Sequence, residues 1–337
     1  MSKSKLYRPT RNQPKNTLKS APKAVSQTAD LQAATIDNAK YPPVLIIILH
    51  FKSLENTRNC LRSVFKMNYP NFNVLLIDNG TGNEDSKGLI KEFNKLFWTP
   101  LSDNEGFAGG CNAGISFGVK NGYKYIWLLN NDTTVENSTL GQLIEVSEQQ
   151  DKVGAANAAI LNTVTKALEP GRGVIDFTRG KTRLKESDNA EFFDCDWLAA
   201  SNLLVNTDAL KEVGAFDERY FLYFEDVELC HRLKLGGWRC LHVPKAHITH
   251  IGGASTEGEL KHWRSYYYTR NRLLFFQTYA GFSQRMAAFL AIWMHLIRHC
   301  VSLPMKGEEG AKQLQAEIAG AQDFIAARYG KWQNSEI

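Results

Sequence analysis

Carboxylate side chains stand at the ends of two strongly apolar segments of the chain. Asp132 follows "YIWLLNN", and Asp78 follows "VLLI". A carboxylate placed where a buried strand enters a loop is a typical ligand for a hard divalent cation, which prefers oxygen donors. The alternative for Asp132 is local, since aspartate often closes the turn that follows a strand. The residues alone leave both interpretations open.

A second acidic pair, Glu225 and Asp226, stands at the start of a predicted helix in "FLYFEDVELCHRL". Acids in a first turn interact favourably with the helix dipole, which is the simple structural interpretation. The aromatic residues Phe221, Tyr223 and Phe224 come just before the pair, so we expect a partly desolvated setting. Desolvation raises the pKa of a carboxyl group and suits it to act as a general base.

The stretch "NEGFAGGCNAGI" carries four glycines around a predicted helix start: Gly106, Gly109, Gly110 and Gly114. They allow the backbone to approach a ligand or a neighbouring strand closely. The GxGxxG spacing of dinucleotide-binding proteins is absent. A ligand-binding loop and tight packing of the helix are therefore the two interpretations.

Cysteines and histidines are concentrated in one later segment. Six of them fall within twenty-one positions: Cys230, His231, Cys240, His242, His247 and His250. Their spacing matches no paired zinc-ligand pattern, so a structural zinc site is not the favoured interpretation. His250 stands at the end of a predicted strand before "IGGAS", and we keep it as a candidate metal ligand.

From Val44 onward, apolar β-rich segments alternate with helical patterns. The segments "VLIIILHF", "FNVLLIDNG", "YKYIWLLNN" and "VGAANAAIL" are predicted strands, and one of the predicted helices covers 139–150. This alternation predicts the strands and crossover helices of an α/β sheet. Ligands gather at the carboxyl ends of strands in such a sheet, so we expect Asp78 and Asp132 to face one crevice. Region 162–195 predicts a hairpin or loop, and the chain beyond about residue 275 predicts helices.

The composition fits one large domain with extensions, since 337 residues with 43% hydrophobic content can bury a substantial core. Much of the net charge of +5 comes from residues 1–40, which we expect to form a basic, disordered arm. No apolar run follows the first cations closely, so we expect no signal peptide and a cytoplasmic location. The six cysteines are scattered, which is typical of reduced thiols.

The most apolar segment of the second half is "MAAFLAIWMHLIRHCVSLP", residues 286–304. It is interrupted by His295, Arg298 and His299, so a membrane-spanning helix is not expected. An apolar face flanked by cations suits a helix that lies in the membrane interface. Packing on the main domain is the alternative.

Five motifs, in this order, resemble the family 2 glycosyltransferases with the GT-A fold: "IDNG", "NEGFAGGCNAG", "LLNND", "GAFDERYFLYFEDVELCHRL" and "HITHIGG". The similarity is greatest to the branch of rhamnosyltransferase-like and galactofuranosyltransferase-like enzymes, and it covers about residues 44 to 275. It implies a mostly parallel, mixed α/β sheet flanked by helices. It also implies a catalytic domain over 41–275 and a helical C-terminal extension over 276–337.

The resemblance implies roles for single residues as well. Asp78 matches the acid that contacts the nucleotide base, and Asp132 and His250 match the site of an Mn²⁺ or Mg²⁺ ion. Asp226, next to Glu225, matches the catalytic base. The other residues implied for the nucleotide-sugar are His50, Phe51, Glu55, Asn104, Gly106, Phe107, Gly109, Asn112 and Asn130. Asn130 replaces the first acid of the family's DxD motif, so the ion would depend more on the diphosphate.

At the acceptor end the resemblance implies Trp197, Asp217, Tyr220 and Tyr223, each with plain packing as its alternative. The implied reaction is an inverting, metal-dependent transfer of a sugar, for example rhamnose, from a dTDP- or UDP-sugar to a polysaccharide or polyprenyl-linked acceptor. Two other functions stay open: a non-catalytic sugar-nucleotide or glycan-binding subunit, and a nucleotide-sugar hydrolase. We expect no nucleic-acid partner. Contact with the inner face of the cell membrane is a further hypothesis, based on the basic arm and residues 286–304.

Overall fold

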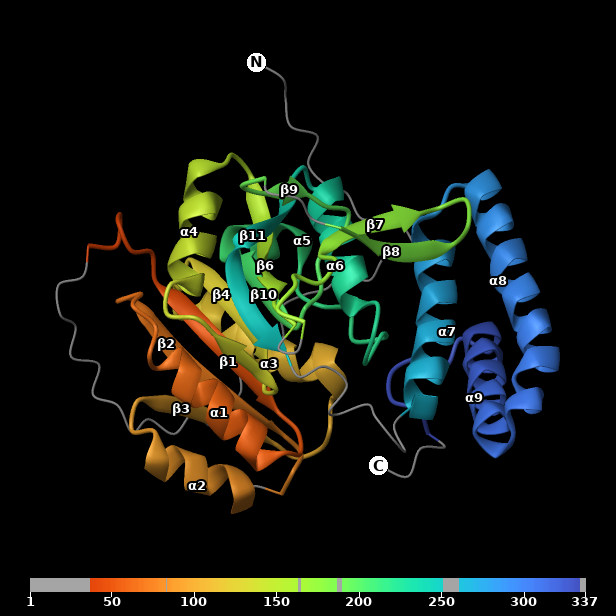
Figure 1. The fold of residues 1–337 in the computed structure, drawn as a ribbon, viewed down its shortest axis with the longest axis horizontal. Helices are drawn as coiled ribbons and strands as arrows, with labels where there is room; N and C mark the ends of the chain where they lie inside the picture. Colours follow the sequence, from red (N-terminus) through yellow and green to blue (C-terminus); the bar gives the residue numbers. More distant parts are fainter. Residues whose placement is uncertain (1–36, 83, 163–164, 187–189, 251–260, 334–337) are drawn as a thin grey trace.

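The computed structural model describes residues 37–82, 84–162, 165–186, 190–250 and 261–333. In these residues one mixed sheet contains β1 (Val44–His50), β2 (Phe72–Asn79), β3 (Leu96–Leu101), β4 (Tyr125–Asn130), β5 (Thr133–Val135), β6 (Val153–Ile160), β9 (Phe193–Asp194), β10 (Asn202–Asn206) and β11 (Arg239–His250). The strand order is β3-β2-β1-β4-β10-β6-β11-β5, and β9 pairs with β11 (Figure 1). Residues 1–36 of the predicted arm over residues 1–40 lie outside the described residues.

The half of the sheet that contains β1 is parallel. β1 pairs in parallel with β2 and β4, and β2 pairs in parallel with β3. β10 enters between β4 and β6 and runs antiparallel to both. The predicted α/β sheet, mostly parallel but mixed, is therefore confirmed. The parallel strands β1, β2, β3 and β4 all end at the same edge of the sheet, and three of them end there in a polar residue: His50, Asn79 and Asn130.

Helices cover both faces of the sheet. They are α1 (Leu54–Val64), α2 (Glu84–Glu92), α3 (Gly106–Lys120), α4 (Thr139–Gln149), α5 (Thr207–Val213) and α6 (Glu225–Leu235). Ile46 and Ile48 of β1 pack with α1, α2 and α4, whereas Leu45 and Ile47 pack with α3, α5 and α6. Because neither face meets water, the strands are apolar along almost their whole length. The predicted helix over 139–150 is α4.

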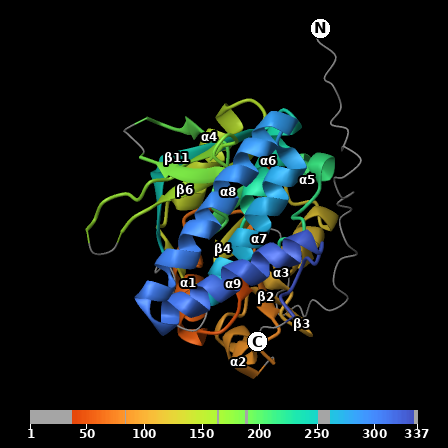
Figure 2. The same ribbon diagram turned by 90° about the vertical axis from the view of Figure 1, so that its right-hand side faces the viewer.

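Three C-terminal helices form a further layer beside the sheet domain: α7 (Lys261–Tyr279), α8 (Phe282–Ser302) and α9 (Glu308–Ile325), with a short 3-10 turn, η2 (Pro304–Lys306), before α9. Figures 1 and 2 show them in blue on one side of the molecule, with α8 outermost. The apolar residues of α7 pack against Tyr220, Phe224 and Val227 at the start of α6. The predicted division at residue 275 falls inside α7, so a division of the chain into two domains there stays a prediction.

The predicted hairpin in region 162–195 is confirmed. β7 (Arg172–Asp176) and β8 (Lys181–Lys185) pair antiparallel as a separate two-stranded sheet. Figure 1 shows this hairpin reaching from the sheet domain toward the C-terminal helices. It thereby extends the surface that the helices form.

Candidate active site

A cavity of about 360 Å³ lies at the carboxyl ends of β1, β2 and β4. Its walls come from β-strand ends, from the start of α3, from the segment before α6 and from the first turn of α7. The lining residues are Leu49, Phe51, Asn79, Asn104, Gly106, Phe107, Asn130, Asn131, Asp132, Phe221, Leu222, Tyr223, His250, Trp263 and Arg264. This volume falls in the range of cavities that hold small-molecule ligands.

Asp132 and His250 meet in this cavity. Oδ1 of Asp132 lies 3.0 Å from Nε2 of His250, and the Asp132 side chain is 6% exposed. The two residues come together because β11 pairs antiparallel with β5, which places His250 opposite Thr133. Nδ2 of Asn130 lies 3.4 Å from the same histidine nitrogen. The three polar residues predicted at the end of β4 and β11 therefore form one group.

The Asp132 and His250 pair fits a divalent metal ion. Two ligands at about 2.1 Å from an ion, at right angles to each other, lie about 3.0 Å apart. Oδ1 of Asp132 is buried and none of the residues that the structure describes donates a hydrogen bond to it, so it has a lone pair available for a cation. Within the described ranges no three His, Cys, Asp or Glu side chains converge on one point. The remaining ligands would thus be water or oxygen atoms of a bound ligand.

The Gly-rich loop forms the opposite wall. Oδ1 of Asn104 accepts hydrogen bonds from the backbone N–H of Gly106, at 2.9 Å, and from Nδ2 of Asn79, at 3.1 Å. Gly106 has a φ of +69°, and a Cβ atom there would overlap the carbonyl oxygen of Phe221. That carbonyl accepts the backbone N–H of Phe107 at 2.8 Å. The glycine is therefore required by close packing of two cavity walls.

The segment before Glu225 has an unusual backbone. Phe221, Tyr223 and Phe224 have φ values of +60°, +65° and +73°. Left-handed conformations cost free energy in residues with a Cβ atom and persist only where the surroundings enforce them. Such strain is found most often at functional sites, which directs attention to Glu225 and Asp226.

Asp226 is held by backbone donors at the start of α6. Its Oδ2 accepts the N–H of Ala200 at 3.2 Å, and its Oδ1 accepts the N–H of Val227 at 2.8 Å. Burial raises the pKa of Asp226 to about 6. Burial, with the neighbouring charge of Asp226, raises the pKa of Glu225 well above its ordinary value. Neither carboxylate is among the residues that line the cavity, although residues 221–223 of the cavity wall lead directly into them.

Two buried residues of α7 hold this segment, and sequence reasoning missed both. Nδ2 of Asn271 lies 2.8, 2.8 and 2.7 Å from the carbonyl oxygens of Tyr220, Leu222 and Tyr223. Nη2 of Arg270 donates to the carbonyls of Arg219 and Tyr220 at 3.0 and 3.1 Å. Helix α7 thus fixes the backbone that leads to Asp226.

Other residues predicted for the nucleotide-sugar lie at the same edge but outside the cavity wall. Asp78 is fully buried and accepts hydrogen bonds from Thr81 and from Ser86, the latter at 2.6 Å. Nδ1 of His50 lies 2.7 Å from Oγ1 of Thr57. Glu55 is exposed on α1 and forms ion pairs with Arg58 and Arg62. The proposed roles of these three residues stay predictions.

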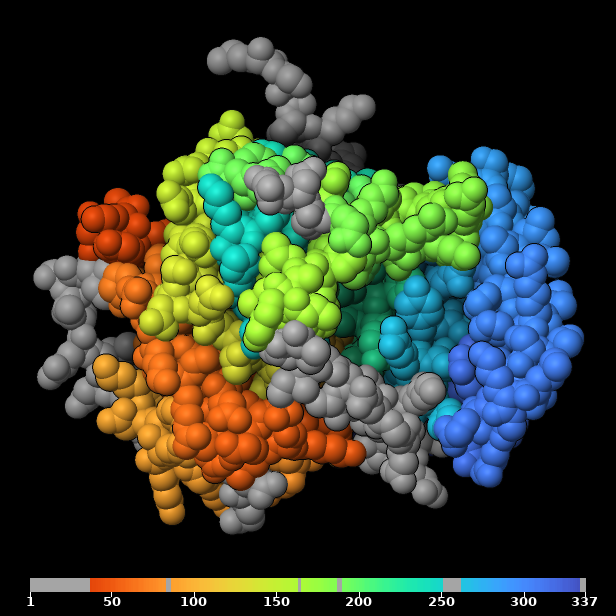
Figure 3. All heavy atoms as spheres, viewed as in Figure 1, coloured from red at the N-terminus to blue at the C-terminus, as the bar shows by residue number. Residues whose placement is uncertain are grey.

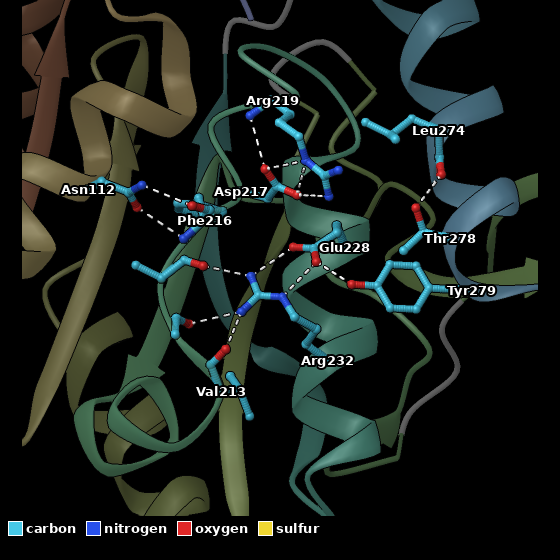
Figure 4. Close-up of polar contacts among 12 residues, drawn as sticks. Asn112, Val213, Phe216, Asp217, Arg219, Glu228, Arg232, Leu274, Thr278 and Tyr279 are labelled. Atoms are coloured by element: carbon cyan, nitrogen blue, oxygen red, sulfur yellow. Dashed lines mark hydrogen bonds and ion pairs between the residues drawn. The ribbon is translucent and has the colours of Figure 1, made fainter. Parts of the chain in front are cut away.

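Gly109 and Asn112 also lie outside the cavity wall, on α3. A Cβ at residue 109 would come within 2.9 Å of Cβ of Glu105, so this position packs against the preceding turn. Asn112 exchanges two hydrogen bonds with the backbone of Phe216, at 2.9 and 3.0 Å (Figure 4). It fixes the segment before α6 from the side of α3.

The four residues predicted for the acceptor occupy different settings. Tyr223 lines the cavity. Tyr220 is fully buried against α7, and Asp217 is buried in a 2.6 Å ion pair with Arg219 (Figure 4). Trp197 packs between the sheet domain and the C-terminal helices. Only Tyr223 of these four residues reaches the described cavity, and the acceptor roles stay predictions.

The cavity also contains polar residues that the sequence did not single out. Asn79 follows Asp78 in the "IDNG" motif, and Asn131 lies within "LLNND", so both motifs held a signal for them. Arg264 and Trp263 come from the first turn of α7, and Arg264 is exposed. Among the described residues of the wall, Arg264 is the only Lys or Arg. It supplies a positive charge suited to an anionic ligand.

Similarity to solved structures defines the class of fold. The mannosyltransferase PcManGT from Pyrobaculum calidifontis, solved with GDP-Man and Mn²⁺, aligns at a TM-score of 0.52 and 11% identity over 93% of this chain and 92% of that chain. GalNAc-T7, solved with UDP, GalNAc and Mn²⁺, aligns at a TM-score of 0.53 and 15% identity over 73% of this chain and 54% of that chain. The fold is the GT-A fold of nucleotide-sugar-dependent glycosyltransferases.

The model of Glycosyl transferase family 2 matches residues 45–213, and the chain belongs to this family. It is a glycosyltransferase. An N-acetylglucosaminyl-diphospho-decaprenol L-rhamnosyltransferase of Mycobacterium tuberculosis is 26% identical over 211 residues, which cover 54% of this chain and 67% of that protein. The rhamnosyltransferase WbbL of Escherichia coli strain K12 is 28% identical over 161 residues, which cover 43% of this chain and 60% of that protein. The resemblance expected from the motifs is therefore confirmed.

Proposed function

We propose that the chain is an inverting, metal-dependent rhamnosyltransferase that acts on a lipid-linked glycan. The observation that carries this proposal is the cavity that Asp132 and His250 line together with Arg264 and the Gly-rich loop, with Asp226 following the cavity wall in sequence. The donor would be a nucleoside diphosphate-rhamnose, with dTDP-rhamnose as the first candidate and UDP-sugars as the alternative.

The choice of rhamnose and of a lipid-linked acceptor rests on the relatives. Two of them are rhamnosyltransferases, and the mycobacterial protein is named for an N-acetylglucosaminyl-diphospho-decaprenol acceptor. This chain spans 67% and 60% of the lengths of these proteins at identities below 30%. We therefore propose for this chain the chemistry that they share, which is rhamnosyl transfer. The exact acceptor is to be identified by experiment.

Asp132 and His250 are the residues that would hold Mn²⁺ or Mg²⁺. When bound, the ion supplies Lewis-acid stabilisation of the negative charge on the departing diphosphate. Arg264 and the amide groups of Asn79 and Asn104 line the same cavity and bind anionic or hydroxyl oxygens of a donor. The two Mn²⁺-containing neighbours are consistent with this arrangement.

The proton chemistry belongs to Asp226. A hydroxyl group that attacks the anomeric carbon loses its proton, and a carboxylate with a pKa of about 6 accepts that proton at neutral pH. Attack and departure on opposite faces of the sugar in one displacement invert the anomeric configuration. Burial, with the charge of Asp226, raises the pKa of Glu225 well above its ordinary value, and we assign the proton acceptor to Asp226.

A reconstituted transfer assay tests this function. The purified full chain is incubated with dTDP-rhamnose, Mn²⁺ and an N-acetylglucosaminyl-diphospho-polyprenol. The molecular mass of the lipid product is then measured by mass spectrometry. We expect a product larger by one deoxyhexose, and no product with GDP-mannose. Nucleotide release at the same rate with and without the acceptor would instead identify a hydrolase. Donor binding without any turnover against lipid-linked acceptors would contradict the proposed transfer.

A further inference from the structure

Helix α8 carries a continuous apolar stripe on its outer face. Six large apolar side chains follow one another at spacings of three or four residues and are 44% to 75% exposed: Phe282, Met286, Leu290, Met294, Ile297 and Val301. The opposite face, with Ala288, Ile292 and Leu296, is buried against the other C-terminal helices. A helix of this length extends over about 30 Å, so the stripe is too long to be a chance surface feature.

The charges on α8 itself are of one sign, and the first acids after it, Glu308 and Glu309, begin α9. The sequence from Phe282 to Gly307 contains no aspartate or glutamate, whereas Arg285, Arg298 and Lys306 fall within it. Arg298 and Lys306 are exposed. None of the helices that the structure describes is long and apolar enough to cross a membrane. An apolar stripe with basic neighbours is instead typical of a helix that lies in the plane of a membrane surface.

The β7–β8 hairpin adds a second group of cations beside α8. A Cβ at Gly180, in the turn of the hairpin, would lie 3.0 Å from Cβ of Ala288, so the turn packs on the buried side of α8. Nε of Arg272 on α7 donates to the Gly180 carbonyl. Figure 3 shows the hairpin, in green, continuous with the blue helices on the molecular surface. Four exposed cations lie on the turn and on β8: Arg179, Lys181, Arg183 and Lys185. The only acid between residues 172 and 185 is Asp176, which pairs with Arg179 and Arg183.

We propose that the exposed stripe of α8 and the cations of β8 together form a docking surface for an anionic lipid bilayer. The inference rests on the proposed function in one respect, because a lipid-linked acceptor has its reactive end at such a bilayer. Burial of the stripe removes apolar area from water, and the hairpin cations add attraction to anionic headgroups. The first turn of α7 lines the donor cavity, and α8 follows the last turn of α7. Docking of α8 would therefore hold the cavity at a fixed position relative to the membrane surface.

Charge complementarity favours a bilayer over a second copy of the chain. In an antiparallel pair of α8 helices, Arg285 of one copy would approach Arg298 of the other, and α8 itself offers no acid to neutralise them. The hairpin cations would increase this repulsion. An anionic lipid surface neutralises both groups of cations at once.

Vesicle flotation with the full chain tests the docking surface. Vesicles of phosphatidylcholine are compared with vesicles that also contain phosphatidylglycerol, at low and high salt. We expect the chain to float only with the anionic vesicles, and salt to release it, because screening weakens the attraction. Leu290→Gln with Ile297→Gln, and separately Lys181→Glu with Arg183→Glu, should each reduce binding by about tenfold or more.

A matched control and a second readout keep the outcomes distinct. Ile325→Gln changes a side chain on α9 that is 69% exposed but off the stripe, so vesicle binding should stay at the wild-type level. All variants should keep wild-type thermal unfolding and wild-type transfer to a water-soluble acceptor analogue. Wild-type protein that never floats would overturn the inference while leaving that transfer intact. Light scattering that shows a dimer dissolved by Leu290→Gln, with vesicle binding unchanged, would assign the stripe to a second copy instead.

Discussion

At the scale of single residues, Glu225 and Asp226 are adjacent carboxylates in unequal surroundings. Asp226 accepts two backbone N–H groups, which favour its charged form. Oε2 of Glu225 is buried and accepts no hydrogen bond from the described part of the chain, which favours its protonated form. The pair therefore divides its roles, with Asp226 as the carboxylate that accepts a proton.

We expect Asp226→Asn to lower kcat by about 10²–10⁴-fold, because the amide cannot accept the acceptor's proton. Donor affinity, measured by calorimetry, should stay within error of wild type. In the wild-type enzyme, kcat should fall as the pH drops below about 6, where Asp226 takes up a proton. A variant that retains full activity, or a rate that does not change across this pH, would contradict the assignment.

The same pKa shift predicts that the free energy of unfolding falls as the pH rises through about 6, whereas kcat rises. A carboxyl group with a raised pKa in the folded state stabilises the fold when protonated, and that contribution is lost as the pH rises through about 6. Asp226→Asn removes this loss. The variant also gives up one backbone hydrogen bond, because its amide nitrogen cannot accept an N–H. Its free energy of unfolding, measured by urea denaturation, should therefore lack the decrease that wild type shows as the pH rises through about 6.

We predict that substitution of Asp132 or His250 lowers the affinity for the metal ion. In thermal-shift titrations with Mn²⁺ and a nucleoside diphosphate, Asp132→Asn should weaken the ion's stabilising effect at least tenfold, because one of two protein ligands is weakened. His250→Gln should act in the same direction. Asp208→Asn, at an exposed position on α5, is the matched control and should leave the titration unchanged. Equal Mn²⁺ dependence in wild type and both site variants would place the ion elsewhere.

At the scale of elements, α7 controls the geometry of α6. Asn271 and Arg270 hold the backbone from residue 219 to residue 223. Tyr279, at the other end of α7, donates its hydroxyl to Glu228, which forms a buried ion pair with Arg232 (Figure 4). Helix α6 is therefore attached to α7 at two places: through the segment before its first turn, and through Glu228.

Replacing Asn271 tests this attachment. Asn271→Ala removes the amide donor from the carbonyl oxygens of Leu222 and Tyr223, whereas that of Tyr220 keeps Arg270, so we expect a loss of about 1–3 kcal/mol in the free energy of unfolding. We also expect kcat to fall more than KM rises, since Asp226 loses its position while most of the donor cavity stays intact. Gln277→Ala, exposed on the same helix, is the control. An Asn271→Ala enzyme with wild-type kcat would show that α7 does not position the base.

The elements differ in how well the sequence predicts them. The strands β1, β2 and β4 can be predicted from their apolar sequences, because strands covered on both faces are apolar throughout. The left-handed backbone of Phe221, Tyr223 and Phe224 is not predictable, since none of these residues is a glycine. It follows from contacts with Asn271, about fifty residues later, which no local pattern reveals. The pairing of Asp132 with His250 depends likewise on the register of β5 and β11.

At the scale of the whole molecule, the C-terminal helices complete the core around the site. Phe276 of α7, Ile292 of α8 and Phe324 of α9 share one buried cluster with Tyr220 and Phe224. The sequence predicts these helices and the α/β domain, and it predicts Asp132, His250, Phe107 and Tyr223 in the cavity region. It does not predict Arg264 or Trp263, because their part in the site depends on how α7 docks.

A fragment that ends at residue 275 tests the predicted domain boundary. It lacks the last turn of α7 and all of α8 and α9, so the apolar residues of the shared cluster become exposed. We expect it to aggregate or to show no cooperative unfolding transition, whereas the full chain should unfold cooperatively. A soluble 41–275 fragment with wild-type unfolding would support an independent catalytic domain.

The most direct measurement is a crystal structure of the Asp226→Asn variant with Mn²⁺ and the nucleoside diphosphate-sugar donor. We predict the diphosphate in the cavity, the ion bound by Asp132 and His250, and the anomeric carbon facing residue 226 across the sugar ring. A donor bound outside this cavity, or residue 226 separated from the anomeric carbon by the cavity wall, would contradict the proposed mechanism.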